Sequence, residues 1–249
     1  MSLQPVVSIA QGIDYYVLEQ LIAGAEKSGS ISRNQWVNKI RAEEKEKEQE
    51  QALLLESDNV PIHPLRLIRE VRDFVDKDAT IIGDGGDFIS FAARVMRIYH
   101  PGHWLDPGSF GSLGFGAGAA IAAKLARPDK QVLLLNGDGS FGFSGMDFDT
   151  MVRKKLPIVS VIGNDTKWGQ VKAYFHATGK TAAGVDLSPD TRYDKVVTAL
   201  GGYGELVEDP GQIRPALERA FASGLPACLN VMLSPDVYYG ERSYKAVDK

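Results

Sequence analysis

Two acidic residues follow two apolar segments that have the composition of buried strands. Asp138 lies in a glycine-acid-glycine turn at residues 137–139, directly after Val132–Asn136, and Asp165 follows the apolar run Pro157–Gly163. The carboxyl ends of successive parallel strands meet at one edge of a sheet, so we expect the two carboxylates to face each other. Two carboxylates with backbone carbonyls form a hard oxygen site that suits Mg²⁺ or Ca²⁺.

The glycines beside Asp138 indicate what such a metal would hold. Gly137 and Gly139 let the backbone approach a ligand closely, and free amides near Ser140 can donate to phosphate oxygens. Magnesium bound by few protein ligands keeps coordination positions for phosphate. The pattern therefore predicts a metal-bound diphosphate. The alternative is a plain strand-to-helix turn capped by Asp138, and only the pairing with Asp165 favours the diphosphate.

Strands and helices alternate along most of the chain. The patterns predict helices at 63–78, 88–98, 114–126, 144–156, 193–200 and 210–223, and strands at 79–82, 132–135, 158–162, 205–207 and 227–233. Ser144 and Asp147 resemble a capping box at the start of the fourth helix. Strands separated by helices predict parallel βαβ units, and hence a three-layer, doubly wound α/β domain with a mostly parallel sheet.

The ends of the chain differ from this domain, which we place at residues 61–235. Residues 1–30 contain an amphipathic stretch, interpreted as a helix that ends near Gly29. Residues 31–60 are dense in charge and predict a surface helix or a linker, with a partner-binding stripe as the alternative. Residues 236–249 are aromatic and basic, and form either a lid or a disordered end.

Composition limits the classes of function. The net charge of -4 offers no basic field for nucleic acid or anionic lipid. No apolar run is long enough to span a membrane, and the N-terminus lacks the pattern of a signal peptide, so a cytoplasmic location is the default expectation. The single cysteine, Cys228, lies in an apolar run and is predicted to be buried.

The spacing from the glycine-acid-glycine turn to Asn164-Asp165 is similar to the signature of thiamine diphosphate enzymes. The segment GSFGSLGFGAGAAIAAKLARPDKQVLLLNGDGSF resembles the acetolactate synthase, oxalyl-CoA decarboxylase and 2-hydroxyacyl-CoA lyase group. GDGGDFISFAARV, WLDPGSFGSLG and GLPACLNVMLSPDVYY fit the 2-hydroxyacyl-CoA lyase branch best. The resemblance covers residues 61–239, and residues 1–25 resemble the last helix of the central domain that precedes this one in such enzymes.

The resemblance implies a role for individual residues. Asp138, Asp165 and the carbonyl of Lys167 would hold Mg²⁺, with Asp165 standing where the family usually has Asn. Gly111 would accept from the exocyclic amine of the cofactor, and Leu113 would enforce its bent conformation. The full set implied for cofactor binding is Asp84, Gly86, Asp87, Gly111, Ser112, Leu113, Gly137, Asp138, Gly139, Ser140, Asp165, Lys167, Trp168 and Gly169.

Several other residues are weaker candidates. Gln170 and His176 follow the predicted metal loop, where the family places residues that face substrate or cofactor. Trp168 either packs beside the cofactor or belongs to the core. His100 and His103 flank a Pro-Gly turn without a paired carboxylate or cysteine, and are interpreted as loop residues rather than ligands.

One part that the family's chemistry needs is not recognisable in the sequence. The resemblance implies an activating Glu on a pyrimidine-binding domain, usually on a neighbouring subunit, so the chain is interpreted as a fragment or one subunit of a split, oligomeric enzyme. The implied function is a lyase or transferase of C–C bonds, acting on an acyl-CoA or 2-ketoacid through a thiazolium carbanion. Acetolactate synthase, with FAD in its central domain, is the first alternative. A non-catalytic domain that keeps the fold is the second.

Overall fold

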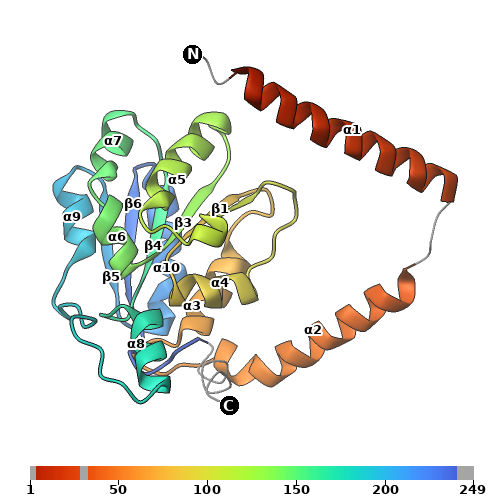
Figure 1. The fold of residues 1–249 in the computed structure, drawn as a ribbon. Helices are drawn as coiled ribbons and strands as arrows, with labels where there is room; N and C mark the ends of the chain where they lie inside the picture. Colours follow the sequence, from red (N-terminus) through yellow and green to blue (C-terminus); the bar gives the residue numbers. More distant parts are fainter. Residues whose placement is uncertain (1–3, 29–32, 240–249) are drawn as a thin grey trace. The chain divides into compact units, whose positions relative to one another are not determined.

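The computed structural model describes residues 4–28 and 33–239, and the chain divides into two compact units at residues 51 and 52. The first unit contains helix α1 (Gln4–Ser28) and most of α2 (Asn34–Leu55), drawn in red and orange in Figure 1. Helix α1 confirms the predicted N-terminal helix. The charge-dense segment, for which a helix and a linker were both left open, lies largely in α2.

A six-stranded parallel sheet forms the centre of the second unit. Its strands are β1 (Thr80–Asp84), β2 (Trp104–Leu105), β3 (Val132–Gly137), β4 (Val159–Asn164), β5 (Tyr203–Val207) and β6 (Ala227–Met232), in the order β2-β1-β3-β4-β6-β5. Strands β3 and β4 are neighbours, with Gly137 opposite Gly163. The residues that follow these two strands therefore meet at one edge, as the sequence predicted.

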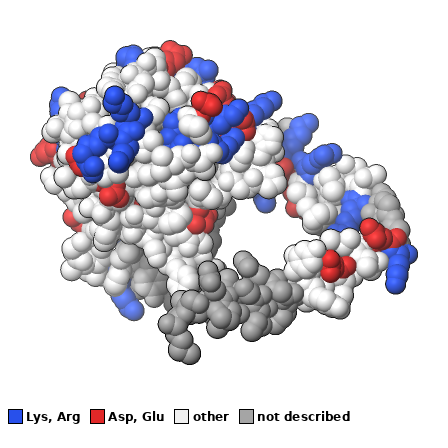
Figure 2. All heavy atoms as spheres, turned by 90° about the horizontal axis from the view of Figure 1, so that it is seen from above, with Lys and Arg blue, Asp and Glu red and all other residues white. Residues whose placement is uncertain are grey.

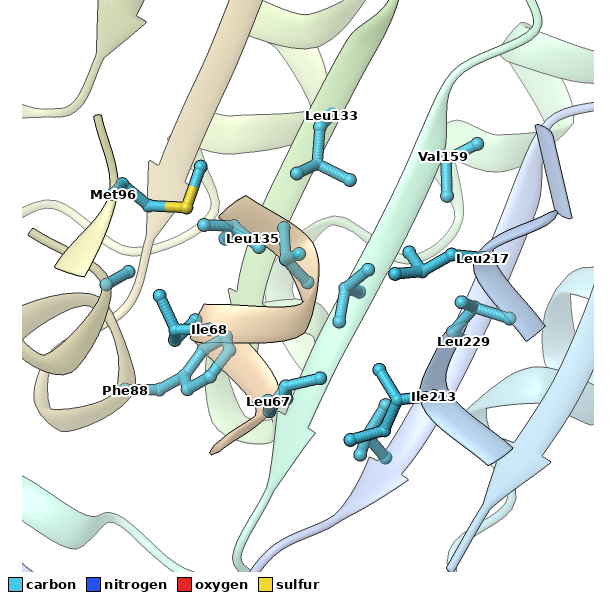
Figure 3. Close-up of a cluster of buried hydrophobic side chains, with 14 of the residues drawn as sticks. Leu67, Ile68, Phe88, Met96, Leu133, Leu135, Val159, Ile213, Leu217 and Leu229 are labelled. Carbon is cyan, nitrogen blue, oxygen red and sulfur yellow. The ribbon is translucent and has the colours of Figure 1, made fainter. Parts of the chain in front are cut away.

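Helices cover both faces of this sheet, which confirms the predicted three-layer fold (Figure 1). Helices α3 (Pro64–Phe74), α4 (Asp87–Val95) and α10 (Pro210–Ala222) pack on one face, and α5 (Phe115–Ala126), α6 (Asp138–Ser144), α7 (Asp147–Arg153) and α9 (Tyr193–Ala199) pack on the other. Side chains alternate along β3: Leu133 and Leu135 join the first cluster, shown in Figure 3, and Leu134 joins the second.

The structure corrects the prediction of one long helix at 144–156. Ser144 ends α6 instead of capping the next helix, and α7 begins at Asp147 with no side-chain cap. The chain turns at Gly145, where a Cβ atom would lie 2.5 Å from the Phe141 ring. The acidic residue that resembled a capping box therefore lies in the first turn of a separate helix, where it complements the helix dipole.

Four elements were not predicted from the sequence. These are α6, where a turn was expected at residues 137–139, β2, the 3₁₀ turn η1 (Gly108–Phe110) and α8 (Gly169–Ala177). Strand β2 has two residues, too few for a period-2 pattern to be recognised. Helix α8 begins directly after the predicted metal loop, so it shapes the region where the ligand was expected.

The distribution of surface charge and the burial of the cysteine agree with what the composition predicted. On the larger unit, basic and acidic side chains are interspersed over the face seen in Figure 2. Over the described ranges, every helix is too short or too polar to cross a bilayer. Cys228 is buried on β6, as predicted, and its burial raises the pKa of the thiol.

Candidate functional site

A cavity of about 200 Å³ opens at the carboxyl ends of β1, β3 and β4. It brings together most of the residues proposed for the cofactor, although they come from four separate segments of the chain. Those in its wall are Gly86, Asp87, Gly111, Leu113, Gly137, Asp138, Gly139, Ser140, Asp165, Lys167, Trp168 and Gly169, joined by Gln170. The loops after three neighbouring strands thus converge where a ligand binds in an open parallel sheet.

Asp138 connects two of these loops. It is buried at the start of α6, where one carboxylate oxygen accepts from the amide of Gly139 at 2.7 Å. The other oxygen accepts from the amide of Lys167 at 3.3 Å. Burial raises the pKa of Asp138 to about 6, against the opposing effect of these backbone hydrogen bonds.

Asp165 and Asp87 carry charge into the same cavity. Burial, and next the charge of Asp138, raise the pKa of Asp165 to about 7. Burial also raises the pKa of Asp87 to about 6. Each of these carboxylates is therefore costly to ionise in the metal-free chain, and a divalent cation between them would reverse that cost.

The donor set is small for an all-side-chain metal site. Within residues 4–28 and 33–239, no cluster of three or more His, Cys, Asp or Glu side chains has the arrangement of a metal site. The set expected from the sequence has only two carboxylates, Asp138 and Asp165, and one backbone carbonyl. Such a set suits Mg²⁺, which usually keeps other positions for water and phosphate oxygens.

Lys167 contributes a feature that sequence reasoning missed, because only its backbone carbonyl was considered. Its side chain is buried, and the ammonium nitrogen finds no hydrogen-bond partner among the residues that the structure describes. This nitrogen lies 3.9 Å from the centre of the Tyr238 ring, a cation–π contact. The positive charge also opposes the rise in the pKa values of Asp87 and Asp165. A buried cation therefore accompanies the acidic residues of the cavity.

The first part of the predicted C-terminal tail lies against the site. The amide of Tyr239 donates to both carboxylate oxygens of Asp87, at 3.1 and 3.2 Å. The Tyr239 ring meets Phe91 edge-on, with 5.3 Å between ring centres. This segment thus borders the cavity through Asp87 and Lys167. Residues 240–249, the rest of the predicted lid or disordered end, lie outside the described residues.

Close packing explains one glycine in the wall, and backbone conformation explains another. A Cβ atom on Gly139 would lie 2.5 Å from the Trp168 ring, so the ring covers the glycine-acid-glycine turn. Trp168 belongs to neither apolar cluster of the core, and the structure places it in the cavity wall. Gly111 adopts φ +57°, a left-handed conformation that favours glycine.

Asp84, which was expected to line the diphosphate end of the cofactor, is not among the residues of the cavity wall. It lies behind the cavity wall, fully buried, and accepts from the amides of Gly114 at 3.1 Å and Gly116 at 2.7 Å. Burial raises its pKa despite these bonds. The carboxylate therefore fixes the loop that carries Gly111 and Leu113. Ser112, on the same loop, is exposed and is not part of the wall.

The histidines lie away from the cavity wall. His176 is exposed on α8. His103 precedes β2 at the opposite edge of the sheet, with its ring centre 4.9 Å from that of His100 and its Nδ1 atom 3.8 Å from Asp78. Gln170 does line the cavity, and its side-chain oxygen lies 2.5 Å from the position of a Cβ atom on Gly86.

Comparison with known proteins agrees with this geometry. Residues 84–231 match the family described as "Thiamine pyrophosphate enzyme, C-terminal TPP binding domain". Acetolactate synthase large subunit IlvG of Mycobacterium tuberculosis is 48% identical over 236 residues, covering 94% of this chain and 43% of the relative. 2-hydroxyacyl-CoA lyase 2 of Caenorhabditis elegans is 38% identical over 192 residues, covering 76% of this chain and 30% of the relative.

A solved structure shares the fold. The thiamine diphosphate-dependent 4-hydroxybenzoylformate decarboxylase of Rhodococcus jostii RHA1 superposes with a TM-score of 0.67 at 27% identity, covering 72% of this chain and 34% of that chain. The chain spans less than half the length of these curated relatives and of this structure.

Proposed function

The chain belongs to the thiamine pyrophosphate enzymes, through their C-terminal TPP-binding domain, and on this basis we propose that its cavity binds the diphosphate of thiamine diphosphate through Mg²⁺. The pairing of Asp138 and Asp165 at the ends of adjacent strands carries the proposal. Their burial and mutual repulsion favour a bound cation. The side chains of Asp138 and Asp165 and the carbonyl of Lys167 would be the protein ligands.

The rest of the wall suits the cofactor that the metal would anchor. Gly139 leaves room for the Trp168 ring in the wall, and Ser140 beside it offers an amide and a hydroxyl to phosphate oxygens. The carbonyl of Gly111 would accept from the exocyclic amine, and Leu113 would support the bent conformation from below. The cofactor itself supplies a carbanion, and the protein supplies position and electrostatics.

A partner domain would complete the site. Four large apolar side chains are exposed on and near the loop of Gly111 and Leu113: Phe110, Phe115, Phe143 and Met146. Phe143 lies against this loop, because a Cβ atom on Gly114 would be 2.8 Å from the Cβ of Phe143. Exposed apolar surface beside a site is typical of an interface. We assign this rim to a pyrimidine-binding domain, on another subunit or elsewhere in a longer chain, that brings the activating Glu.

The N-terminal segments fit the same assembly. We infer that residues 1–30 are the last helix of a preceding domain and that residues 31–60 connect it to the cofactor domain at 61–235. Helix α1 exposes the apolar side chains of Tyr15, Leu18, Leu21 and Ile22. These side chains suit a helix that packs against a further domain.

Two reactions fit a domain of this group, both of which make or break a C–C bond beside a carbonyl. The sequence segments favour a 2-hydroxyacyl-CoA lyase-like reaction, our first candidate. The higher identity to the acetolactate synthase relative favours the second, an acetolactate synthase-like condensation of 2-ketoacids. Supplying both substrate classes to the chain together with its pyrimidine-binding partner would separate them. Cofactor binding without turnover of either would indicate a non-catalytic domain.

Calorimetric titration tests the cofactor site directly. We expect thiamine diphosphate to bind the chain, with its partner domain present if required, only when Mg²⁺ is added. Asp138→Ala should abolish this binding, because it removes a metal ligand and the acceptor for the Gly139 and Lys167 amides. Binding that needs no Mg²⁺, or that survives in Asp138→Ala, would contradict the proposal.

A further inference from the structure

Phe143 lies outside the cavity wall but contacts a residue that forms it. This side chain is on α6 and is 67% exposed. Its ring meets the Trp168 ring edge-on, with 6.1 Å between ring centres and 65° between ring planes. We propose that Phe143 is a positioning residue, which holds the Trp168 ring against the glycine-acid-glycine turn in the arrangement that the cofactor needs. The inference rests on the proposed function of the cavity.

Helix α6 determines the direction in which Phe143 points. Phe141 is buried in the second apolar cluster, where its ring centre lies 5.3 Å from that of Tyr193 and 5.8 Å from that of Phe148. Residues two apart on a helix point in different directions, so the anchoring of Phe141 turns Phe143 away from the core. The same helix begins at Asp138, so one short element connects the proposed metal ligand to Phe143.

Gly139 and Phe143 together form a seat for the Trp168 ring. They are four residues apart in α6 and therefore lie on the same face of this helix. A Cβ atom on Gly139 would lie 2.5 Å from the Trp168 ring, so the glycine provides the space that the ring fills. Phe143 closes this space one helical turn later, where its ring meets Trp168. The seat thus lies on the turn that would bind phosphate.

The orientation of the Trp168 ring depends on contacts of this kind. The Trp168 backbone is fixed, because its amide donates to the Val185 carbonyl at 2.8 Å and its carbonyl accepts from the Lys172 amide at 2.9 Å. These bonds do not determine where the ring points. A T-shaped aromatic contact does so, since it favours one arrangement of the two rings.

Phe143 is itself held from a further side by the loop of Gly111 and Leu113. A Cβ atom on Gly114 would lie 2.8 Å from the Cβ of Phe143, so the Gly114 backbone packs closely against the base of this side chain. The Gly114 amide donates to Asp84 at 3.1 Å, which fixes the loop in turn. The support for Trp168 therefore extends to a fully buried carboxylate.

The test replaces Phe143 with Ala in the full chain and follows the Trp168 ring by fluorescence. Trp36→Phe and Trp104→Phe provide the background, in which Trp168 is the only tryptophan. In the ligand-free protein, Phe143→Ala should move the Trp168 emission to longer wavelength and increase its quenching by acrylamide, because the ring reaches water more often. Mg²⁺-dependent affinity for thiamine diphosphate, with the partner domain present if required, should fall about 3- to 10-fold as the held ring becomes less populated.

Two further variants separate the aromatic contact from the loss of exposed apolar surface. Phe143→Tyr keeps the ring and should retain both the fluorescence and the affinity of the background protein. Leu125→Ala is the matched control, since it truncates a side chain that is 65% exposed, at the end of α5 that is away from the cavity. It should leave both readouts unchanged.

Three outcomes would overturn the proposal. In the first, Phe143→Ala matches Leu125→Ala in both readouts, which would assign Phe143 to the partner interface alone. In the second, Phe143→Tyr loses as much as Phe143→Ala, so that the ring is not what matters. In the third, the fluorescence shifts but the affinity does not, so that the position of the ring has no effect on the cofactor.

A fourth variant covers the case in which Phe143→Ala fails to fold, as judged by thermal unfolding. Phe143→Leu keeps apolar contact but lacks the ring that meets Trp168, so both readouts should shift in the same direction by a smaller factor; no shift in either would overturn the proposal. If wild type binds no thiamine diphosphate with Mg²⁺ and partner present, the proposed function fails instead. The fluorescence of the ligand-free chain would then still decide whether Phe143 holds the Trp168 ring.

Discussion

The carboxylates of the cavity show how far single residues can be interpreted from sequence. Asp138 and Asp165 were predicted to meet because each follows a strand, and they influence each other's charge in the structure. The ammonium of Lys167 and the hydrogen bonds of Asp84 could not be predicted. Their partners, Tyr238 and the amides of Gly114 and Gly116, are far away in sequence, and no spacing rule connects them.

The raised pKa of Asp165 gives a prediction for the metal-free chain. Folded, Asp165 has a pKa of about 7, above its ordinary value of 3.8, so folding is favoured when the group is protonated. Its contribution to stability is full below pH 3.8 and is lost as the pH rises through 7. We expect Asp165→Asn to unfold at a temperature about 2 °C or more above wild type at pH 8.

Thermal unfolding at two pH values checks this prediction. The advantage of Asp165→Asn should shrink at pH 5, because wild-type Asp165 is then largely protonated in the folded state. Added Mg²⁺ should raise the unfolding temperature of wild type at pH 8, since the cation offsets the repulsion among the carboxylates. An advantage that is equal at both pH values would show that the charge of Asp165 is not its cause.

At the scale of elements, helix α5 contains a matched pair of glycines. A Cβ atom on Gly116 would lie 2.6 Å from the side chains of both Asp84 and Leu134, whereas one on Gly118 would meet nothing within 4 Å. We expect Gly116→Ala to lower the free energy of unfolding by about 1–3 kcal/mol through overpacking. Gly118→Ala should raise it by roughly 0.5–1 kcal/mol through helix propensity.

Urea unfolding of both variants measures these two changes. Gly116→Ala should also weaken cofactor binding, because Asp84 holds the loop of Gly111 and Leu113 through the Gly114 and Gly116 amides. Equal stability of the two variants would mean that the close approach at Gly116 is relieved at no cost, and that the loop is held by other contacts.

The elements themselves were predictable where a pattern was long enough. Strands β3, β4 and β6 are apolar runs that are buried on both faces, and they were found with small errors at their ends. Helix α6 was missed because its glycine-rich sequence favours a turn, and the later start of α7 depends on the Phe141 ring beside Gly145, a contact made only after packing. Helix α8 was missed because its apolar residues form no clear stripe.

At the scale of the whole molecule, the exposed apolar rim leads to a prediction about assembly. Phe110 is 95% exposed and Met146 is 68% exposed, so replacing both with Ser should change the free energy of unfolding by only about 0.5 kcal/mol for each residue. The chain's association with a pyrimidine-binding partner, or with a second copy of itself, should weaken at least about tenfold. This corresponds to a loss of about 1.4 kcal/mol in the free energy of association.

Sedimentation or calorimetry with the partner domain measures this association. Leu125→Ser is the control: it is 65% exposed, but lies at the end of α5 that is away from the cavity. The control should associate like wild type. If Leu125→Ser weakens association as much as the double variant, the rim next to the cavity has no special part in assembly.

The position of β6 has a consequence for how the chain is made. It is the last strand among the described residues, yet it lies between β4 and β5 in the sheet. Until residues 227–232 have left the ribosome, β4 has an unpaired edge, and such an edge can recruit a strand from another nascent chain. Asn230, which accepts a hydrogen bond from Asn164 next to the Asp165–Lys167 loop, also arrives only with this strand, so that loop should gain its final shape only after the sheet is closed.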